Sequence, residues 1–189
     1  MSWLISGVAL WFIAHGFKAL FPNTRKKMNE KLGEEKAKGP FALAIFMSFV
    51  LIIFGWRHSD PSAGLYQTAE YLDVISGLLI TFSIYLFIGS TANIRIRRWI
   101  RHPQLTGLGL WSIGHLLTNG EYRSIVLFGG LGIWAVTMML SINHRDGKHT
   151  PPKPGSAKDE IKPVVISLIV VAVLKLTHGF YTAESLIPW

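Results

Sequence analysis

The apolar residues of this chain fall into blocks of about twenty, and that pattern limits its fold more than any other feature. An α-helix rises 1.5 Å per residue, so a block of that length covers the ~30 Å hydrocarbon layer of a bilayer. Hydrophobic residues make up 50% of the chain and its mean hydropathy is +0.35, more than a soluble domain of 189 residues typically carries. The sequence therefore predicts an all-α, polytopic membrane protein.

Six such blocks can be distinguished, and we expect each to form a transmembrane helix. The fourth is the shortest and the least apolar of the six. No internal repeat and no second domain are evident, so the whole chain, 1–189, is predicted to form a single transmembrane domain. The predicted spans cover residues 2–21, 40–56, 71–91, 103–118, 124–143 and 163–181.

The Lys and Arg residues are distributed unequally over the connections between these spans. The first, third and fifth connections hold most of them, whereas the second and fourth carry only Arg57 and Arg123. Because basic loops stay in the cytoplasm, this alternation predicts a protein of the cytoplasmic (inner) membrane with both termini on the outer, periplasmic side. The alternation would be lost without the fourth span. The basic residues of the odd connections are Arg25, Lys26, Lys27, Lys31, Lys36, Lys38, Arg95, Arg97, Arg98, Arg101, Arg145, Lys148, Lys153, Lys158 and Lys162.

The net charge of +8 would by itself suggest a nucleic acid as partner. Because the positive charge lies on alternate loops, we interpret it as the signal that orients the protein in the membrane. It also attracts the anionic headgroups of the membrane lipids. We therefore expect contacts with lipid and no binding of nucleic acid. The lack of cysteine in the sequence further excludes disulfides, thiolate-ligated haem and iron–sulfur clusters held by cysteine.

Four of the seven histidines, His15, His102, His115 and His178, lie inside or at the mouth of predicted spans. An ionisable group at membrane depth is costly, so it typically lines a cavity, pairs with another group or binds something, and imidazole binds metals and haem. His102 and His115 are roughly 20 Å apart along one helix, so they cannot bind one metal from that helix alone. Depth in the membrane pairs His115 with His178, although helix tilt weakens that ranking. For each histidine taken alone, an interhelical hydrogen bond is the alternative.

Gly107 and Gly114 lie on one face of the fourth predicted span, two turns apart. Small residues at such positions let either a neighbouring helix or a flat ligand approach the backbone. Plain helix packing is the simpler of these two interpretations.

The fourth and fifth spans, together with the residues before them, resemble the central signature of the NnrU family. The similarity extends to the first span and loop and covers about residues 1–143, while the sixth span matches only through its helix and His178. The residues that carry the resemblance are Arg101, His102, Pro103, Trp111, His115, Leu116, Leu117, Asn119, Gly120, Leu127, Phe128 and Gly129, then His15, Arg25, Gly33, Phe41 and Gly55 in the first part.

The resemblance implies a polytopic protein of the cytoplasmic membrane or plastid. The family includes proteins associated with nitrite and nitric oxide metabolism in denitrifying bacteria. Its plant and cyanobacterial relative is zeta-carotene isomerase, a haem b protein that turns a cis double bond to trans in a redox-dependent way. By resemblance, the haem iron would be held by His15 and His115, with His102 as the nearby signature histidine. His178 is the substitute for His15 that depth suggests.

We therefore expect a membrane protein that binds one haem b through His15 and His115. If it is an enzyme, it is a haem-dependent cis–trans isomerase of a polyene; otherwise the haem binds nitric oxide in connection with denitrification. Two alternatives stay open: a cofactor-free membrane scaffold or assembly factor with structural histidines, and a quinol-linked electron-transfer protein. The glycine-bearing faces also leave a homo-oligomer open.

Overall fold

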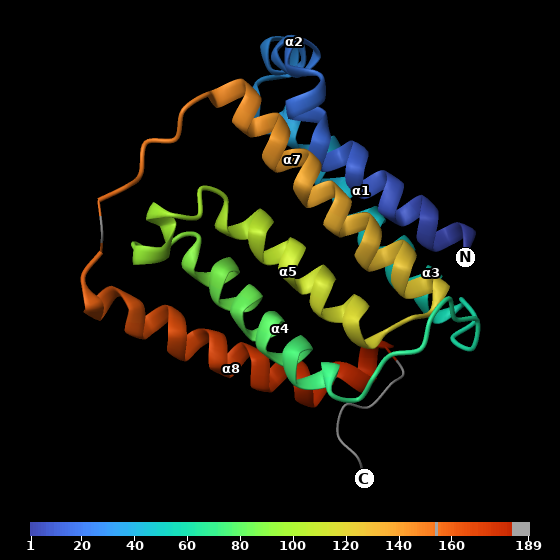
Figure 1. Cartoon of the computed structure of the whole chain (residues 1–189). Coiled ribbons are helices and arrows are strands. Elements are labelled where there is room, and N and C mark those ends of the chain that lie inside the picture. The colour runs from blue at the N-terminus through green and yellow to red at the C-terminus, as the bar shows by residue number, and fades with distance from the viewer. Residues whose placement is uncertain (154, 183–189) are drawn as a thin grey trace. The chain divides into compact units, whose positions relative to one another are not determined.

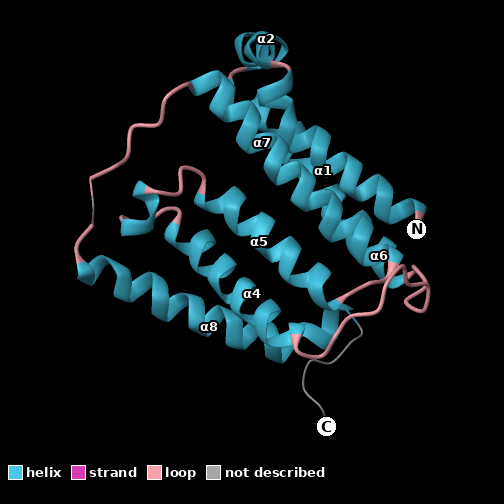
Figure 2. Ribbon diagram, in the orientation of Figure 1, coloured by secondary structure: helices cyan, strands magenta, loops and turns pink. Residues whose placement is uncertain are grey.

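The computed structural model describes residues 1–153 and 155–182, apart from the side chains of Lys18, Tyr181 and Thr182. In this part of the chain the regular structure is helical, with no strand and one isolated antiparallel bridge between Gly64 and Glu121 (Figure 2). The prediction of an all-α protein is thus confirmed for the described residues. The chain divides into two compact units, residues 1–62 and residues from Ala63 onward.

The first unit consists of two long helices with a short one between them. The long helices, α1 and α3, pack against each other at glycines. A Cβ atom on Gly7 would lie 2.8 Å from the amide nitrogen of Ile52, so the two backbones approach more closely than any larger residue allows. Such close approach is typical of helices in membranes. The helices of this unit are α1 (Ser2–Leu20), α2 (Pro22–Leu32) and α3 (Glu34–Arg57).

The short helix α2 falls within the basic first connection that the sequence predicts. None of its residues is buried. Pro22 occupies its first turn, where a missing N–H group costs nothing, and Gly33 ends it with a φ of 78°, a backbone conformation that favours glycine. The helical segments Ser2–Phe17 and Pro22–Leu32 are bent by 75° relative to each other. The first connection is therefore a polar helix and not an irregular loop.

The long helices of the second unit form a row in the order α8, α4, α5 and α7 (Figure 1). The helix α4 contacts both α8 and α5, and α5 contacts α7. Two short elements, α6 and η2, continue directly into α7, so this helical run extends from Tyr122 to Asp146. The elements of this unit are α4 (Leu72–Gly89), η1 (Arg95–Arg98), α5 (Pro103–Thr118), α6 (Tyr122–Ser124), η2 (Ile125–Gly129), α7 (Gly130–Asp146) and α8 (Ala157–Thr182).

Each of the six predicted spans coincides with a helix, but six membrane crossings are not confirmed. Within the described residues, four helical runs are long and apolar enough to cross a bilayer, namely α3, α4, Tyr122–Asp146 and α8. The helix α1 meets the same standard only together with α2, as a broken span or a re-entrant segment. The helix α5 has 16 residues and falls short of it. Several helices thus fit a membrane, and the six-span topology stays a prediction.

Two helices begin before the predicted spans that they contain, and in both the predicted span starts at a proline inside the helix. The predicted starts are Pro40 and Pro163, whereas α3 begins at Glu34 and α8 at Ala157. Each proline lies only two turns into its helix, so it removes a single backbone hydrogen bond there and the helix continues across it. Acidic residues in the first turn of both helices stabilise these additional turns through the helix dipole.

Small polar residues are buried between the helices, while large apolar residues cover their outer faces. The side chains of Ser48, Ser83 and Ser112 have at most 1% of their surface exposed. Leucine, isoleucine, valine and phenylalanine are exposed along α3, α4, α7 and α8. Large apolar residues such as Leu4 and Leu86 are buried as well, but the extensive apolar outer surface fits lipid as the surrounding solvent, because lipid tails are as apolar as leucine and helices then associate through small residues.

Candidate functional site

His115 lies near the C-terminal end of α5. Its Nδ1 atom is 2.9 Å from the backbone carbonyl oxygen of Trp111, one turn earlier. Because a carbonyl oxygen only accepts hydrogen bonds, Nδ1 carries the proton, and in the neutral ring Nε2 keeps its lone pair. Histidines that bind metals typically hold their second nitrogen in this way. His115 therefore presents Nε2 as an electron-pair donor.

Two aromatic rings lie against the half-buried imidazole of His115. The ring of Phe128, from η2, stacks on it with a centroid distance of 4.3 Å and an interplanar angle of 21°. The ring of Trp111 is tilted against it at 4.6 Å and 52°, and it meets Phe128 edge to face at 4.9 Å. Ring pairs at these distances attract each other beyond the effect of burial. The imidazole is thus held in a small aromatic cluster.

In the first unit, His15 of α1 shows the same local arrangement. Its Nδ1 atom lies 3.3 Å from the carbonyl oxygen of Trp11, and its ring stacks on Trp11 at 3.9 Å and 28°. Phe49 of α3 meets the Trp11 ring edge to face at 5.2 Å. The sequence Trp-x-x-x-His therefore occurs at 11–15 and again at 111–115, a spacing that places ring and imidazole on one helix face. This repeat was not predicted, although it can be read from the sequence.

This local arrangement does not by itself mark a binding site. His58, at the end of α3, is exposed, yet its Nδ1 atom lies 2.8 Å from the carbonyl oxygen of Phe54. Its ring also stacks on Phe54, at 4.0 Å and 26°. An aromatic residue one turn before a histidine is enough to produce the geometry. His15 and His115 differ from His58 in being half-buried inside apolar helices, which makes His58 a matched comparison.

His102 immediately precedes α5 and connects it with α7. Its Nε2 atom lies 2.9 Å from the side-chain oxygen of Asn143. The neighbouring Arg101 donates a hydrogen bond of 2.6 Å to the carbonyl oxygen of Gly147. Both hydrogen bonds connect the beginning of α5 with the end of α7. Nε2 of His102 therefore takes part in a contact between helices.

His178 lies on α8, in the same unit as His115, and the two imidazoles are close enough to interact electrostatically. His15 belongs to the first unit. The pairing of His115 with either His15 or His178 stays a prediction. No group of three or more His, Cys, Asp or Glu side chains that could hold a metal ion is found among the described residues.

Gly107 and Gly114 both face α4. A Cβ atom on Gly107 would lie 2.9 Å from the carbonyl oxygen of Ser83, and one on Gly114 would lie 2.9 Å from Cγ1 of Ile80. The hydroxyl of Ser76 donates a hydrogen bond of 2.7 Å to the carbonyl oxygen of Gly114. The interpretation of these glycines as helix-packing residues is confirmed, because α4 fills the space beside them.

A polar loop closes the end of α5 next to His115, and nothing in the sequence pattern predicted it. The hydroxyl of Tyr66 donates to the carbonyl oxygens of Leu116 and Asn119, the latter at 3.1 Å. A side chain at Gly120 would overlap the backbone of Tyr66, so this turn requires glycine. Burial raises the pKa of Tyr66, and its hydroxyl therefore remains a donor at neutral pH. The loop stabilises the turn of α5 that carries His115.

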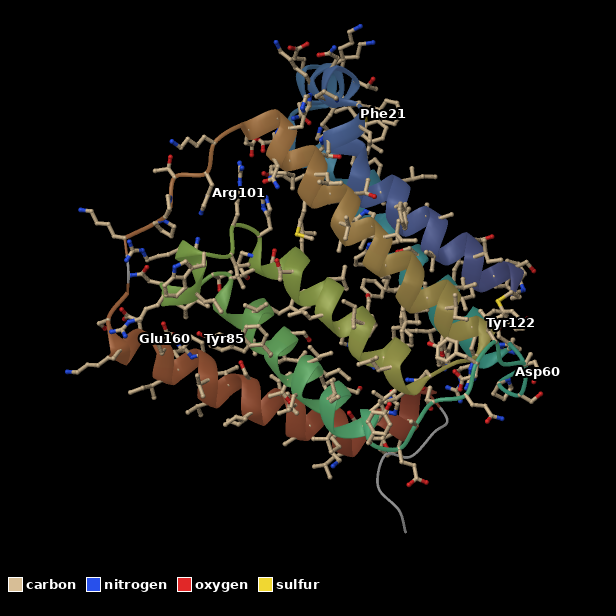
Figure 3. All side chains as sticks on the ribbon, viewed as in Figure 1. Phe21, Asp60, Tyr85, Arg101, Tyr122 and Glu160 are labelled. Atoms are coloured by element: carbon tan, nitrogen blue, oxygen red, sulfur yellow. The ribbon has the colours of Figure 1, made fainter. Side chains whose placement is uncertain are left out.

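Near the other end of α4, a carboxylate of α8 joins three elements. Glu160 accepts a hydrogen bond of 2.6 Å from the hydroxyl of Tyr85 on α4 and another of 2.6 Å from the backbone N–H of Arg95 in η1. The side chains of Tyr85 and Glu160 lie next to each other in Figure 3. This contact positions the beginning of α8, the helix that carries His178.

The fold and the site together define a class of protein: a helical membrane protein whose apolar helices carry half-buried histidines beside aromatic rings. The model of the NnrU protein family matches residues 3–184, which is nearly the whole chain. The chain belongs to the NnrU family. The resemblance seen in the sequence is thereby confirmed, and the family match also covers the sixth predicted span. No curated protein and no solved structure matches the chain.

Proposed function

We propose that this protein binds one haem b within the membrane and that His115 and His15 would hold its iron. The observation that carries the proposal is that His15 and His115, unlike the exposed His58, are half-buried in apolar helices while Nδ1 of each imidazole bonds a tryptophan carbonyl oxygen. That hydrogen bond assigns the proton to Nδ1, so Nε2 carries the lone pair in the neutral ring, which is the tautomer that iron binding requires. His178, within electrostatic range of His115, is the alternative second ligand.

The chemistry of the donor set fits a haem better than a metal ion held by protein groups alone. A porphyrin supplies most of the ligands of its iron, so one or two histidines are sufficient. The half-buried rings of Trp11 and Trp111 offer apolar surface beside the two imidazoles, as a largely apolar macrocycle needs. We assign His102 to the contact with Asn143 and not to the iron.

When bound, the haem would supply a redox-switchable Lewis acid. Within this proposal it serves either the redox-dependent cis–trans isomerisation of a polyene or the binding of nitric oxide in connection with denitrification. The Nδ1 hydrogen bond is shorter at His115, 2.9 Å, than at His15, 3.3 Å. His115 is therefore the better oriented of the two imidazoles, and we propose it as the ligand common to both functions.

The test is a visible absorption spectrum of the purified protein, oxidised and reduced with dithionite, with and without carbon monoxide. We expect a Soret band and sharp reduced bands that disappear in His115→Ala and in one of His15→Ala and His178→Ala. His58→Ala is the matched control and should leave the spectrum unchanged, because that histidine has the same local geometry on an exposed helix end.

The outcomes separate the competing functions. Carbon monoxide binding supports an iron that opens one position, as isomerisation and nitric oxide binding require. Unchanged reduced bands in carbon monoxide support a permanently bis-ligated electron-transfer protein. A colourless protein from haem-replete cells refutes the haem proposal and favours a cofactor-free scaffold or assembly factor.

We also propose that the protein lies in the cytoplasmic membrane with both termini on the periplasmic side. The alternating basic loops support this topology. The chain has no cysteine, so a single introduced cysteine reports sidedness without any background. We expect an impermeant maleimide to label Ser62→Cys in intact spheroplasts and Thr150→Cys only after permeabilisation; the reverse result would exclude this orientation.

A further inference from the structure

Phe128 reaches His115 from a helical segment other than its own. Trp111 and His115 are one turn apart on α5, so their contact follows from helix geometry. Phe128 instead belongs to η2, the π-helical turn Ile125–Gly129 that precedes α7. Its side chain is 5% exposed, and its ring covers one face of the His115 imidazole. The contact between α5 and η2 is therefore made at the candidate ligand itself.

The wide turn η2 occurs at the point where this contact is made. A π-helical turn closes its hydrogen bonds one residue later than an α-helix does, and such turns are rare and found frequently at functional sites. Gly129 and Gly130 follow Phe128 directly. Glycine holds a regular α-helix poorly, so the sequence favours an irregular turn here. The π-helical turn thus contains Phe128, the residue whose ring stacks on His115.

The hydrogen bond and the stacked ring constrain the imidazole in different ways. The bond from Nδ1 to the Trp111 carbonyl oxygen holds one edge of the ring but allows the ring to tilt about the line of that bond. A second ring lying nearly parallel on its face, 21° from it, opposes that tilt. The direction in which Nε2 points is therefore determined jointly by α5 and η2.

We infer that Phe128 is a positioning residue: it holds the plane of the His115 imidazole, and with it the direction of Nε2, through the π-helical turn η2. The consequence for haem rests on the function proposed above. Partners that orient a metal-binding histidine typically change the affinity of the site by 10- to 100-fold when they are removed. We expect Phe128 to act at the lower end of that range, because it contributes a stacking contact and no hydrogen bond.

Three variants of the full-length protein in detergent test this inference. Phe128→Leu keeps an apolar side chain but removes the flat ring, and Phe128→Tyr keeps the ring. Phe87→Leu is the matched control: Phe87 packs at Gly107, two turns from His115 on the α5 side of α4. A thermal melt of each variant checks that it is folded.

Two measurements are made on each variant. Nitrogen NMR of histidine-labelled protein without haem reports the ring of His115, whose signal is assigned through His115→Ala. The rate of haem transfer to apomyoglobin and the ferric electron paramagnetic resonance spectrum report the loaded site. In Phe128→Leu we expect a shifted and broadened His115 signal, about tenfold faster haem release and altered g-values. Phe128→Tyr and Phe87→Leu should behave like the wild type.

The two proposals fail in different ways. A Phe128→Leu variant with wild-type NMR signals, haem release and g-values overturns the positioning role, while the coloured protein still supports haem binding. A wild-type protein that takes up no haem overturns the proposed function. In that case the NMR line width of His115 decides the positioning role by itself: broadening in Phe128→Leu alone supports it, and an unchanged line width overturns it.

Discussion

Replacing Gly107 with alanine should push α5 away from α4. The added Cβ atom would lie 2.9 Å from the carbonyl oxygen of Ser83 and 3.2 Å from a ring carbon of Phe87. Ordinary contact begins at 3.4 Å, and a backbone oxygen cannot rotate away, so the helices must separate by about half an ångström at this point. Overpacking of this kind costs ~1–3 kcal/mol. The better helix propensity of alanine returns ~1 kcal/mol, so we expect a net loss of ~1 kcal/mol in the free energy of unfolding.

Gly109→Ala is the matched control on the same helix. Among the described residues, no atom outside the neighbouring backbone of α5 lies within 4 Å of the Cβ position of Gly109, so only the gain in helix propensity applies and the variant should be as stable as the wild type or more stable. Reversible unfolding of both variants in mixed detergent micelles, followed by tryptophan fluorescence, measures the difference. If Gly107→Ala and Gly109→Ala prove equally stable, then close packing of α5 on α4 does not require glycine at position 107.

Two further predictions concern the polar contacts at opposite ends of the second unit. Tyr66→Phe removes the hydroxyl that caps α5 and should lower the free energy of unfolding by ~1 kcal/mol, while Tyr71→Phe, at an exposed ring, should change nothing. Folding raises the pKa of Tyr66, so its hydroxyl contributes to the free energy of unfolding below the pKa of the unfolded state. This contribution is lost as the pH rises through the pKa of the folded state. The stability of the wild type should therefore fall above about pH 10, and that of Tyr66→Phe should fall less. Glu160→Gln weakens the hydrogen bonds that this side chain accepts from Tyr85 and from the N–H of Arg95. It should therefore accelerate hydrogen exchange in the first turns of α8. Unchanged exchange there would show that Glu160 does not hold the beginning of this helix.

The helices were predictable because a membrane helix must satisfy its own backbone in a run of about twenty apolar residues, and such runs are visible in any sequence. The helical parts that were missed are polar. The helix α2 has no apolar face to detect, and the first turns of α3 and α8 are charged residues ahead of Pro40 and Pro163. Hydropathy identifies helical segments that lie in lipid but does not identify polar helical segments outside the membrane.

The candidate site was predictable only in part. The histidines stood out because an ionisable group is costly at membrane depth, and Trp111 could have been found from its spacing to His115. Phe128 and Tyr66 come from other segments and meet the end of α5 only after folding. Their roles depend on the π-helical turn and on the loop before α4, and neither feature leaves a periodic signal in the sequence.

The burial of serine and glycine between helices whose outer faces are apolar has a thermodynamic consequence. When such helices separate within lipid, their apolar side chains remain in lipid, and little apolar surface is transferred to water. The heat-capacity change on unfolding, which arises from that transfer, should then be small. The free energy of unfolding in a bilayer should accordingly vary almost linearly with temperature, without the cold-side decline of a water-soluble protein.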